Sequence, residues 1–437
     1  MNTRNNLDDI TIRVMLWGKF IGILKWDWNK DIAIFQFTKE YINDPINLIP
    51  TKNKTVGAFY GNKNEKYQGL PEFIADSLPD DWGNILFDKW LAKNRIPSVR
   101  SNPLLKLAFI GKRGIGALEY LPEVKPVLDG NRTVDINELQ KIAEFVYRKK
   151  EESKIGKQQE ATLSSLIELG TSIGGKHPKG IVARNRTTGE FRSGQVELPP
   201  DYDYYILKFK ENPEIPTSEI EMIYHEMAIE AGIRMMPSEL IEINGMKHFM
   251  TKRFDRVNGE KLHTQTMAAI IPNGNDYTHL FFLCESLGVP YEDKEQLFRQ
   301  MVFNHAAGVT DDHNKNFTFI MDREGKWRIS PAYDLMFTAN IWENPSASVH
   351  CLGLAGKRTH VTIQDLSEFA EDFKIKDHKK IIEQVLKSIS TFHDKCEKYK
   401  INSEWETKIS NSLKTIFPIT HNLKPKEKLK HKKAMKL

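Results

Sequence analysis

Residues 308–335, GVTDDHNKNFTFIMDREGKWRISPAYDL, combine a β-hairpin with three polar residues at defined positions. Two runs of alternating apolar and polar residues flank a turn from Asp322 to Gly325, which predicts two short antiparallel strands. Asp311 and Asn316 precede the first strand in the spacing D-x-x-x-x-N, and Asp334 follows the second strand. This order of elements restricts both the fold and the chemistry that the chain can support.

Protein kinases need these residue types in this order. Their first aspartate orients the substrate hydroxyl, their asparagine binds magnesium, and a second magnesium-binding aspartate follows a hairpin. Magnesium prefers hard oxygen ligands, which an amide and a carboxylate supply. Asp311 is therefore the candidate catalytic residue, and Asn316 and Asp334 are the candidate magnesium ligands. We expect His313 to contact phosphate or support the site rather than to bind metal.

Two other interpretations of this segment exist. Aspartate and asparagine are common in turns, so an isolated D-x-x-x-x-N pattern also fits an ordinary loop. A calcium-binding loop is excluded because His313 and Lys315 occupy its third and fifth positions and Asn316 replaces its glycine.

Residues 170–177, GTSIGGKH, approach the Walker phosphate-binding pattern. His177 replaces the serine or threonine that would bind magnesium, and Pro178 and Gly180 follow where a P-loop would begin a helix. The residues after it, GIVARNRTTGEF, have the pattern of a β-hairpin. We therefore expect a glycine-rich loop over nucleotide phosphates, with Lys179 as an added cation, and a flexible surface loop is the alternative.

The same stretch contains G-x-S-x-G, the nucleophile elbow of serine hydrolases, and Asp334 with His350 or His360 would complete a triad in the right order. That motif requires a helix directly after Ser172. The glycines and proline that follow oppose a helix, so the hydrolase interpretation is disfavoured.

Lys208 lies in the strand-like run DYYILKFK, where it could reach nucleotide phosphates. Glu219, Glu221 and Glu226 of the following helix are possible ion-pair partners, and we predict Glu221. A solvent-facing lysine on an edge strand is the alternative. The run MTKRFDR would connect a β-rich lobe to a helical lobe, with backbone groups at Lys252 and Phe254 facing an adenine. An ordinary charged strand end fits it equally well.

The rest of the chain predicts an α+β organisation. Residues 11–37 predict antiparallel strands with Ile12, Val14 and Leu16 on one face, and residues 69–95 predict a helical stretch. Further helices are expected at 135–150 and at 218–232, with a polar linker between them, and the chain is mainly helical after Met267. The predicted units are an N-terminal α+β subdomain (1–125), a β-rich lobe (126–260), a mainly helical lobe (261–423) and a basic tail (424–437).

The composition of the 437-residue chain is that of a globular protein, with 40% hydrophobic and 28% charged residues. No transmembrane helix or signal peptide is predicted, and three widely spaced cysteines suit a reducing cytoplasm. The net charge of +5 is concentrated in the tail, whose seven lysines and one glutamate give +6 and leave −1 for the body (5 − 6). We interpret the tail as a solvated terminus, with contact to nucleic acid or an acidic partner as the alternative.

Taken together, these motifs resemble those of the HipA-type serine/threonine kinases, the toxins of bacterial toxin–antitoxin pairs. The resemblance depends on GTSIGGKHPKG, YILKFK, MTKRFDR followed by KLHTQT, GVTDDHNKNF and SPAYDL, in that order. GLPEFIADSLPDDWG and GKRGIGALEY extend it to the N-terminal subdomain, so it covers most of residues 10–400. It implies a two-lobed, protein-kinase-like α+β fold preceded by a β-rich subdomain.

The resemblance also implies the roles of individual residues. Asp311 would be catalytic, Asn316 and Asp334 would bind Mg2+, and Ser172 would be autophosphorylated, which ejects the loop and stops ATP binding. A phosphate there would add about −1.5 to −2 charges and repel ATP. The implied nucleotide-binding residues are Ser172, Ile173, Gly174, Gly175, Lys176, His177, Lys179, Lys208, Lys252, Phe254, Asp255, Gln265 and His313. Lys176, His177 and Pro178 depart from the loop sequence of some family members.

The partners implied by the resemblance are a helix-turn-helix antitoxin of HipB type and a protein substrate such as an aminoacyl-tRNA synthetase. DNA contact would be made through the antitoxin, because this chain has no helix-turn-helix signature, and no membrane contact is expected. Two further functions stay open on sequence alone: a kinase-fold enzyme that phosphorylates a small molecule, and a non-catalytic module that holds an antitoxin at DNA.

Overall fold

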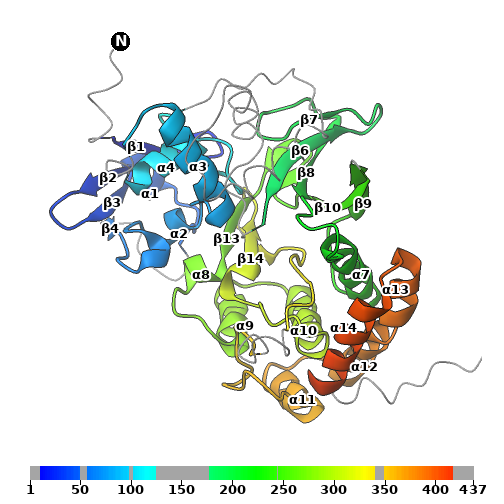
Figure 1. The fold of residues 1–437 in the computed structure, drawn as a ribbon. Helices are drawn as coiled ribbons and strands as arrows, with labels where there is room; N and C mark the ends of the chain where they lie inside the picture. The colour runs from blue at the N-terminus through cyan, green and yellow to red at the C-terminus, as the bar shows by residue number, and fades with distance from the viewer. Residues whose placement is uncertain are drawn as a thin grey trace, which may run out of the picture.

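The computed structural model describes residues 10–49, 57–97, 102–124, 177–243, 245–339 and 349–416. In these residues the chain forms an N-terminal module, a β-rich lobe and a mainly helical lobe (Figure 1). The predicted helix at 135–150, the polar linker and the basic tail lie outside the described residues.

The N-terminal module is built on an antiparallel sheet with strand order β4-β3-β2-β1-β5. Alternation in β1 buries Ile12, Val14 and Leu16, as predicted. The elements of the module are β1 (Ile12–Leu16), β2 (Lys19–Asp27), β3 (Ile32–Phe37), β4 (Ala58–Tyr60), β5 (Leu118–Leu121), α1 (Lys39–Asn43), η1 (Glu65–Tyr67), α2 (Glu72–Ala75), α3 (Asp81–Lys93) and α4 (Pro103–Ile110).

The helical stretch predicted at 69–95 is divided into two helices. Pro79 cannot donate a backbone hydrogen bond, and Asp80 adopts an extended conformation as the N-cap of α3. The break places Asp80 at the start of α3.

The β-rich lobe is a second antiparallel sheet, with strand order β7-β6-β8-β10-β9. The hairpin predicted after the glycine-rich stretch is confirmed by β6 and β7. Helix α7 covers the sheet through contacts with β9 and β10. The elements are β6 (Lys179–Asn185), β7 (Phe191–Ser193), β8 (Tyr202–Lys208), α7 (Thr217–Glu230), β9 (Ser238–Ile243) and β10 (Met246–Lys252).

The third part begins at Arg256 and is mainly helical, as predicted. A three-stranded sheet, β13-β14-β15, lies where it joins the other parts, and β14 and β15 form the predicted hairpin. The elements are β11 (Arg256–Val257), β12 (Glu260–Lys261), β13 (His263–Thr266), α8 (Met267–Ile270), α9 (Tyr277–Ser286), α10 (Tyr291–Ala306), η3 (Asn314–Asn316), β14 (Thr318–Met321), β15 (Trp327–Ile329), α11 (Ile363–Asp372), α12 (His378–Ile389), α13 (Phe392–Tyr399) and α14 (Ser403–Ile416).

One apolar core joins the N-terminal module to the helical lobe. It runs from Val14 in β1 through Tyr277 in α9 to Leu413 in α14. The sheet of the β-rich lobe has a smaller core of its own, which includes Val182 and Met250. The N-terminal module is therefore packed into the body of the protein rather than attached by a linker alone.

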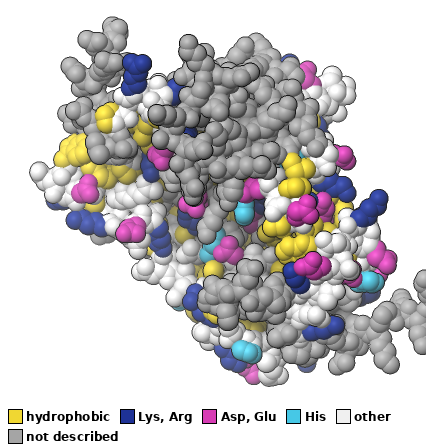
Figure 2. All heavy atoms as spheres, in the orientation of Figure 1, with side chains coloured by type: hydrophobic (Ala, Val, Ile, Leu, Met, Phe, Trp, Pro, Cys, Tyr) yellow, Lys and Arg dark blue, Asp and Glu magenta, His cyan; other side chains and the backbone are white. Residues whose placement is uncertain are grey.

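The described surface has no dominant charge on the face shown in Figure 2, where acidic and basic side chains are interspersed. None of the described helices is both long enough and apolar enough to cross a lipid bilayer.

Candidate active site

Lys208 lies at the end of β8, a central strand between β6 and β10, so the edge-strand interpretation is wrong. Its Nζ is 2.5 Å from Oε1 of Glu221 on α7, which confirms the predicted ion pair. The same Nζ donates a hydrogen bond to Oδ1 of Asp334. One ammonium group thus joins the sheet, helix α7 and the segment after the β14–β15 hairpin.

This arrangement stabilises the charged forms of Lys208 and Asp334. Burial disfavours the ammonium of Lys208, but Asp334 and Glu221 outweigh this effect and raise its pKa. Burial likewise opposes ionisation of Asp334, but Lys208 and Lys179 lower its pKa to about 2. Asp334 is therefore a carboxylate at neutral pH.

Lys179 supplies a second buried cation. It is directly opposite Lys208 in the register between β6 and β8, so both side chains leave the same face of the sheet. Its residue is only 5% exposed, and burial lowers its pKa while Asp334 opposes this shift. Two lysines and Asp334 consequently share one charged cluster.

Asp334 has an unusual backbone conformation, with a φ of 52° in the left-handed region. Non-glycine residues in this region are uncommon and occur more often at functional sites. The preceding residue, Tyr333, donates a hydrogen bond from its hydroxyl to the carbonyl of Lys315 at 2.7 Å. This bond connects the Asp334 segment to the loop that carries Asp311 and Asn316.

The Asp311 loop is held by its backbone and presents its carboxylate outward. Asn316 Nδ2 donates to the Asp311 carbonyl at 2.8 Å, and the Thr338 hydroxyl accepts from the Asp311 amide at 3.0 Å. The Asp311 side chain is 63% exposed, and His313 Nε2 lies 4.0 Å from its Oδ1. His313 also contributes to the low pKa of Asp334, so it lies near both carboxylates.

The sequence analysis missed the neighbouring residue, Asp312. Its carboxylate is fully buried and accepts hydrogen bonds from the Tyr277 hydroxyl (2.7 Å) and His350 Nδ1 (3.0 Å). It also accepts from the backbone amides of Cys351 (2.8 Å) and Leu352 (3.3 Å). Asp312 therefore anchors the loop to the protein interior, while the Asp311 carboxylate faces solvent. No local pattern distinguishes the two adjacent aspartates.

The N-terminal module also reaches the site. Asp80, at the start of α3, lies 2.6 Å from Nζ of Lys315 in the Asp311 loop. Trp82 donates from Nε1 to the backbone carbonyl of Lys179 at 2.8 Å. Both contacts join residues far apart in the sequence, so spacing could not reveal them.

Of the residues predicted near an adenine, Lys252 and Phe254 lie in the connection between the two lobes and Gln265 lies in β13. Lys252 pairs with Asp203 at 2.9 Å, and the Phe254 ring stacks on Tyr333 with centroids 5.7 Å apart. The Gln265 amide donates to the Leu48 carbonyl at 2.8 Å. The side chains of this segment are thus engaged in protein contacts.

The side chain of Asp255 is also engaged in contacts within the protein. Its carboxylate is bonded by Arg253, Arg256 and the amide of Gly116 at 2.6–2.9 Å. Burial opposes its charge, but the two guanidinium groups lower its pKa. The connection is therefore braced by the N-terminal module.

Of the predicted glycine-rich loop, His177 and Lys179 are described. His177 is exposed and its Nδ1 lies 2.7 Å from Glu211. The other predicted loop residues, Ser172, Ile173, Gly174, Gly175 and Lys176, lie outside the described residues.

The contacts of Asp334 and His350 argue against the serine hydrolase interpretation. Asp334 is bonded by Lys208, and His350 is bonded to Asp312. The Asp334–His350 dyad of a triad does not form.

The candidate magnesium ligands have suitable chemistry. Asp334 provides an ionised carboxylate and Asn316 an amide oxygen, the hard ligands that magnesium prefers. Among the described residues, no cluster of three or more histidine, cysteine, aspartate or glutamate side chains could hold a metal ion. A magnesium ion held by these two residues would need phosphate oxygens and water to complete its shell.

Sequence comparisons find curated relatives that match part of this chain. "Putative kinase Y4dM" of Sinorhizobium fredii is 23% identical over 189 residues, which are 42% of this chain and 46% of the relative. "Putative kinase Y4mE" of the same organism is 25% identical over 138 residues, 28% of this chain and 33% of the relative. The chain thus matches less than half the length of either relative.

A structural comparison covers nearly the whole chain. The HipA chain of Shewanella oneidensis, solved in a complex with HipB and operator DNA, superposes with a TM-score of 0.63 at 17% identity. The match covers 93% of this chain and 95% of that chain, which shows a shared fold. The Lys208–Glu221 pair, the β-rich lobe and the helical lobe make this fold kinase-like.

Family models assign both parts of the molecule. Residues 12–121 match the HipA N-terminal domain, and residues 171–392 match the HipA-like C-terminal domain. With a match over more than half of its length, the chain belongs to the HipA family.

Proposed function

We propose that this chain is an ATP- and magnesium-dependent serine/threonine protein kinase that acts as the toxin of a toxin–antitoxin pair. The observation that carries the proposal is the junction at Lys208, which joins Glu221 and Asp334. His313 lies 4.0 Å from the exposed Asp311 and lowers the pKa of Asp334, so it connects this junction to the Asp311 loop. In active protein kinases the corresponding lysine–glutamate pair and magnesium-binding aspartate must both be in place.

The described residues divide the reaction between them. Asp311 orients the hydroxyl of the protein substrate and accepts its proton, and its exposed carboxylate leaves room for that substrate. Lys208 and Lys179 bind the phosphates of ATP from the sheet. Asn316 and Asp334 hold magnesium, which neutralises charge on the transferred phosphoryl group.

We base the proposed partner and substrate on the family. The complex of the Shewanella relative with HipB and operator DNA supports pairing with a helix-turn-helix antitoxin that makes the main DNA contact. We propose a translation component such as an aminoacyl-tRNA synthetase as the substrate, with growth arrest as the result. The described cysteines Cys284, Cys351 and Cys396 are free, which suits work in the cytoplasm.

We also propose that Ser172 is an inhibitory autophosphorylation site. It precedes Lys179, the first residue of β6, in the sequence, and the resemblance to HipA-type kinases implies that its phosphorylation stops ATP binding. About −1.5 to −2 added charges would repel the nucleotide.

The test compares wild type with Asp311→Ala after incubation with magnesium and ATP, by intact mass and peptide mapping. We expect a phosphate on Ser172 in wild type alone, and transfer to a protein substrate reduced at least about a thousandfold in the variant, because the group that orients the hydroxyl is lost. Thermal unfolding should be nearly unchanged, because the removed carboxylate is mostly exposed. A folded Asp311→Ala protein with full activity would refute the assignment.

A further inference from the structure

Helix α7, which carries Glu221, is held on two opposite faces. Glu221 contacts Lys208 of the sheet. Glu230 lies nine residues after Glu221, roughly two and a half helical turns, so the two side chains leave opposite sides of the helix. A rotation of α7 about its axis would therefore disturb both faces together.

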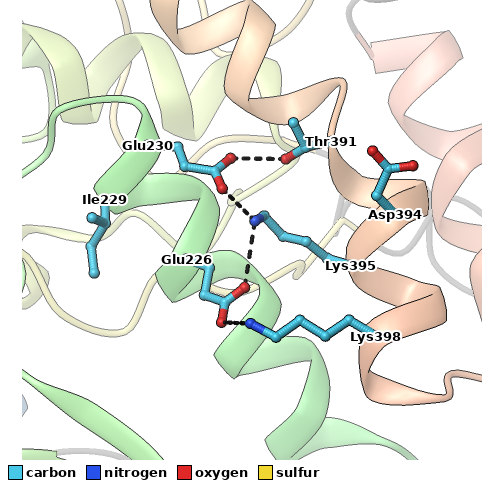
Figure 3. Close-up of a pocket in the computed structure, with 7 residues that line it drawn as sticks. All are labelled: Glu226, Ile229, Glu230, Thr391, Asp394, Lys395 and Lys398. Atoms are coloured by element: carbon cyan, nitrogen blue, oxygen red, sulfur yellow. Dashed lines mark hydrogen bonds and ion pairs between the residues drawn. The ribbon is translucent and has the colours of Figure 1, made fainter. Parts of the chain in front are cut away.

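The face that is turned away from the sheet contacts α13. Figure 3 shows Lys395 and Lys398 extending from α13 toward Glu226 and Glu230 of α7. These residues line a cleft of about 500 Å³. Lys395 Nζ lies 2.6 Å from Glu230 and 3.4 Å from Glu226. Lys398 Nζ lies 2.5 Å from Glu226.

Lys395 is the central group of this network. Its side chain is 9% exposed, compared with 57% for Lys398, so its charge is much less screened by solvent. Burial opposes ionisation of Glu226, but hydrogen bonds from Lys398 and Tyr399 and the charge of Lys395 lower its pKa. The network is therefore charged on both helices at neutral pH.

Other contacts hold α7 without replacing the network. Arg299 and Gln384 donate to the carbonyls of Ala231 and Glu230 at the end of the helix, and the Tyr224 hydroxyl donates to the Ala307 carbonyl. These bonds fix the end and the middle of α7. The Glu230–Lys395 contact adds a restraint on the face opposite Glu221.

We propose that Lys395 is a positioning residue, which holds α7 in the orientation at which Glu221 meets Lys208. The last helical layer thereby sets the geometry of the phosphate-binding lysine in the other lobe. The kinetic consequence rests on the proposed kinase function, whereas the structural consequence does not.

The first test is hydrogen exchange of the free protein, comparing wild type, Lys395→Met and Lys395→Arg. Methionine keeps most of the apolar stem and removes the charge, and arginine keeps the charge. We expect Lys395→Met to accelerate exchange at least fivefold at amides 220–224, near Glu221, and Lys395→Arg to remain close to wild type. Faster exchange confined to residues 226–231 in Lys395→Met would overturn the proposal.

A matched control is Lys408→Met. Lys408 forms an ion pair with Glu404 at 2.6 Å within α14, so it tests the loss of a lysine from the same helical layer without a bond to α7. It should leave exchange in α7 at the wild-type level. An equal change in both methionine variants would show a general loosening and overturn the proposal.

The second test measures phosphoryl transfer in a double-mutant cycle. We expect Lys395→Met to lower kcat about tenfold and Lys395→Arg to restore most of it. In a Glu221→Gln background, Lys395→Met should have little further effect, because both changes act through the same pair. Additive losses would overturn the proposal. If wild type transfers no phosphate, the proposed function fails, and the exchange experiment still decides the role of Lys395.

Discussion

The buried carboxylate of Asp312 gives a sharp prediction about how the Asp311 loop is held. Asp312→Asn keeps the shape of the side chain and replaces one oxygen by an NH2 group. The backbone amides of Cys351 and Leu352 can only donate, so the remaining oxygen should face them. The NH2 group then faces the Tyr277 hydroxyl and His350, which donate to Asp312 in the wild type.

The expected loss follows from those two bonds. A hydrogen bond to a charged acceptor contributes about 1.5–3 kcal/mol to the free energy of unfolding, so two such bonds contribute about 3–6 kcal/mol. His350 can change tautomer and accept instead, which recovers part of the loss. We therefore expect Asp312→Asn to lower the free energy of unfolding by about 2–4 kcal/mol, with slower phosphoryl transfer because Asp311 is the adjacent residue.

The assay is urea unfolding followed by tryptophan fluorescence, with Asp322→Asn as the matched control. Asp322 lies in the exposed β14–β15 turn and accepts only from nearby backbone amides, so its replacement should cost less than about 1 kcal/mol. If Asp312→Asn unfolds at the same urea concentration as Asp322→Asn, the anchoring role is refuted.

Two further predictions concern pH. Burial lowers the pKa of His248 to about 4 and of His263 to about 3, and it lowers the pKa of His305 well below 6.5, so the unfolded chain binds protons that the folded chain does not. The free energy of unfolding should therefore be highest above pH 6.5 and should decrease below it by up to about 4 kcal/mol per pH unit. Equal urea midpoints at pH 7 and pH 5 would contradict this prediction. Burial raises the pKa of Asp334, and Lys208 is one of the cations that lower it to about 2. Lys208→Met removes this cation, so the pKa of Asp334 should rise and its carboxylate should be protonated at higher pH than in wild type. The acid limb of magnesium-dependent nucleotide binding should therefore move to higher pH in fluorescence titrations between pH 4 and 8, and an unmoved limb would count against the cluster.

Local patterns predicted much of the fold. Alternation identified β1, β8 and the β14–β15 hairpin, and the pattern of the helix expected to end at Gly232 identified α7. The same patterns brought Lys208 and Glu221 into one prediction, since a strand and the next helix of the chain commonly pack together.

Contacts between distant segments were beyond such patterns. Nothing near Asp80 in the sequence indicates Lys315, which is 235 residues away, and nothing near Gln265 indicates the Leu48 carbonyl. The adjacent residues Asp311 and Asp312 have the same local chemistry, and only the tertiary structure buries one of them. These features depend on how the N-terminal module and the helical lobe pack, which a one-dimensional pattern does not record.

The bracing of the connection between the lobes has a consequence for how this protein can evolve. Gly116 has a φ of 78° and donates its amide to Asp255, and a Cβ added there would lie 2.4 Å from Thr264 Oγ1. A side chain at residue 116 would thus need a compensating change in β13. Loss of the whole module would leave the buried charges of Arg253 and Asp255 open to solvent on one side. The N-terminal module thus acts as a structural part of the kinase-like body, so a substitution on one side of this contact alters the requirements on the other.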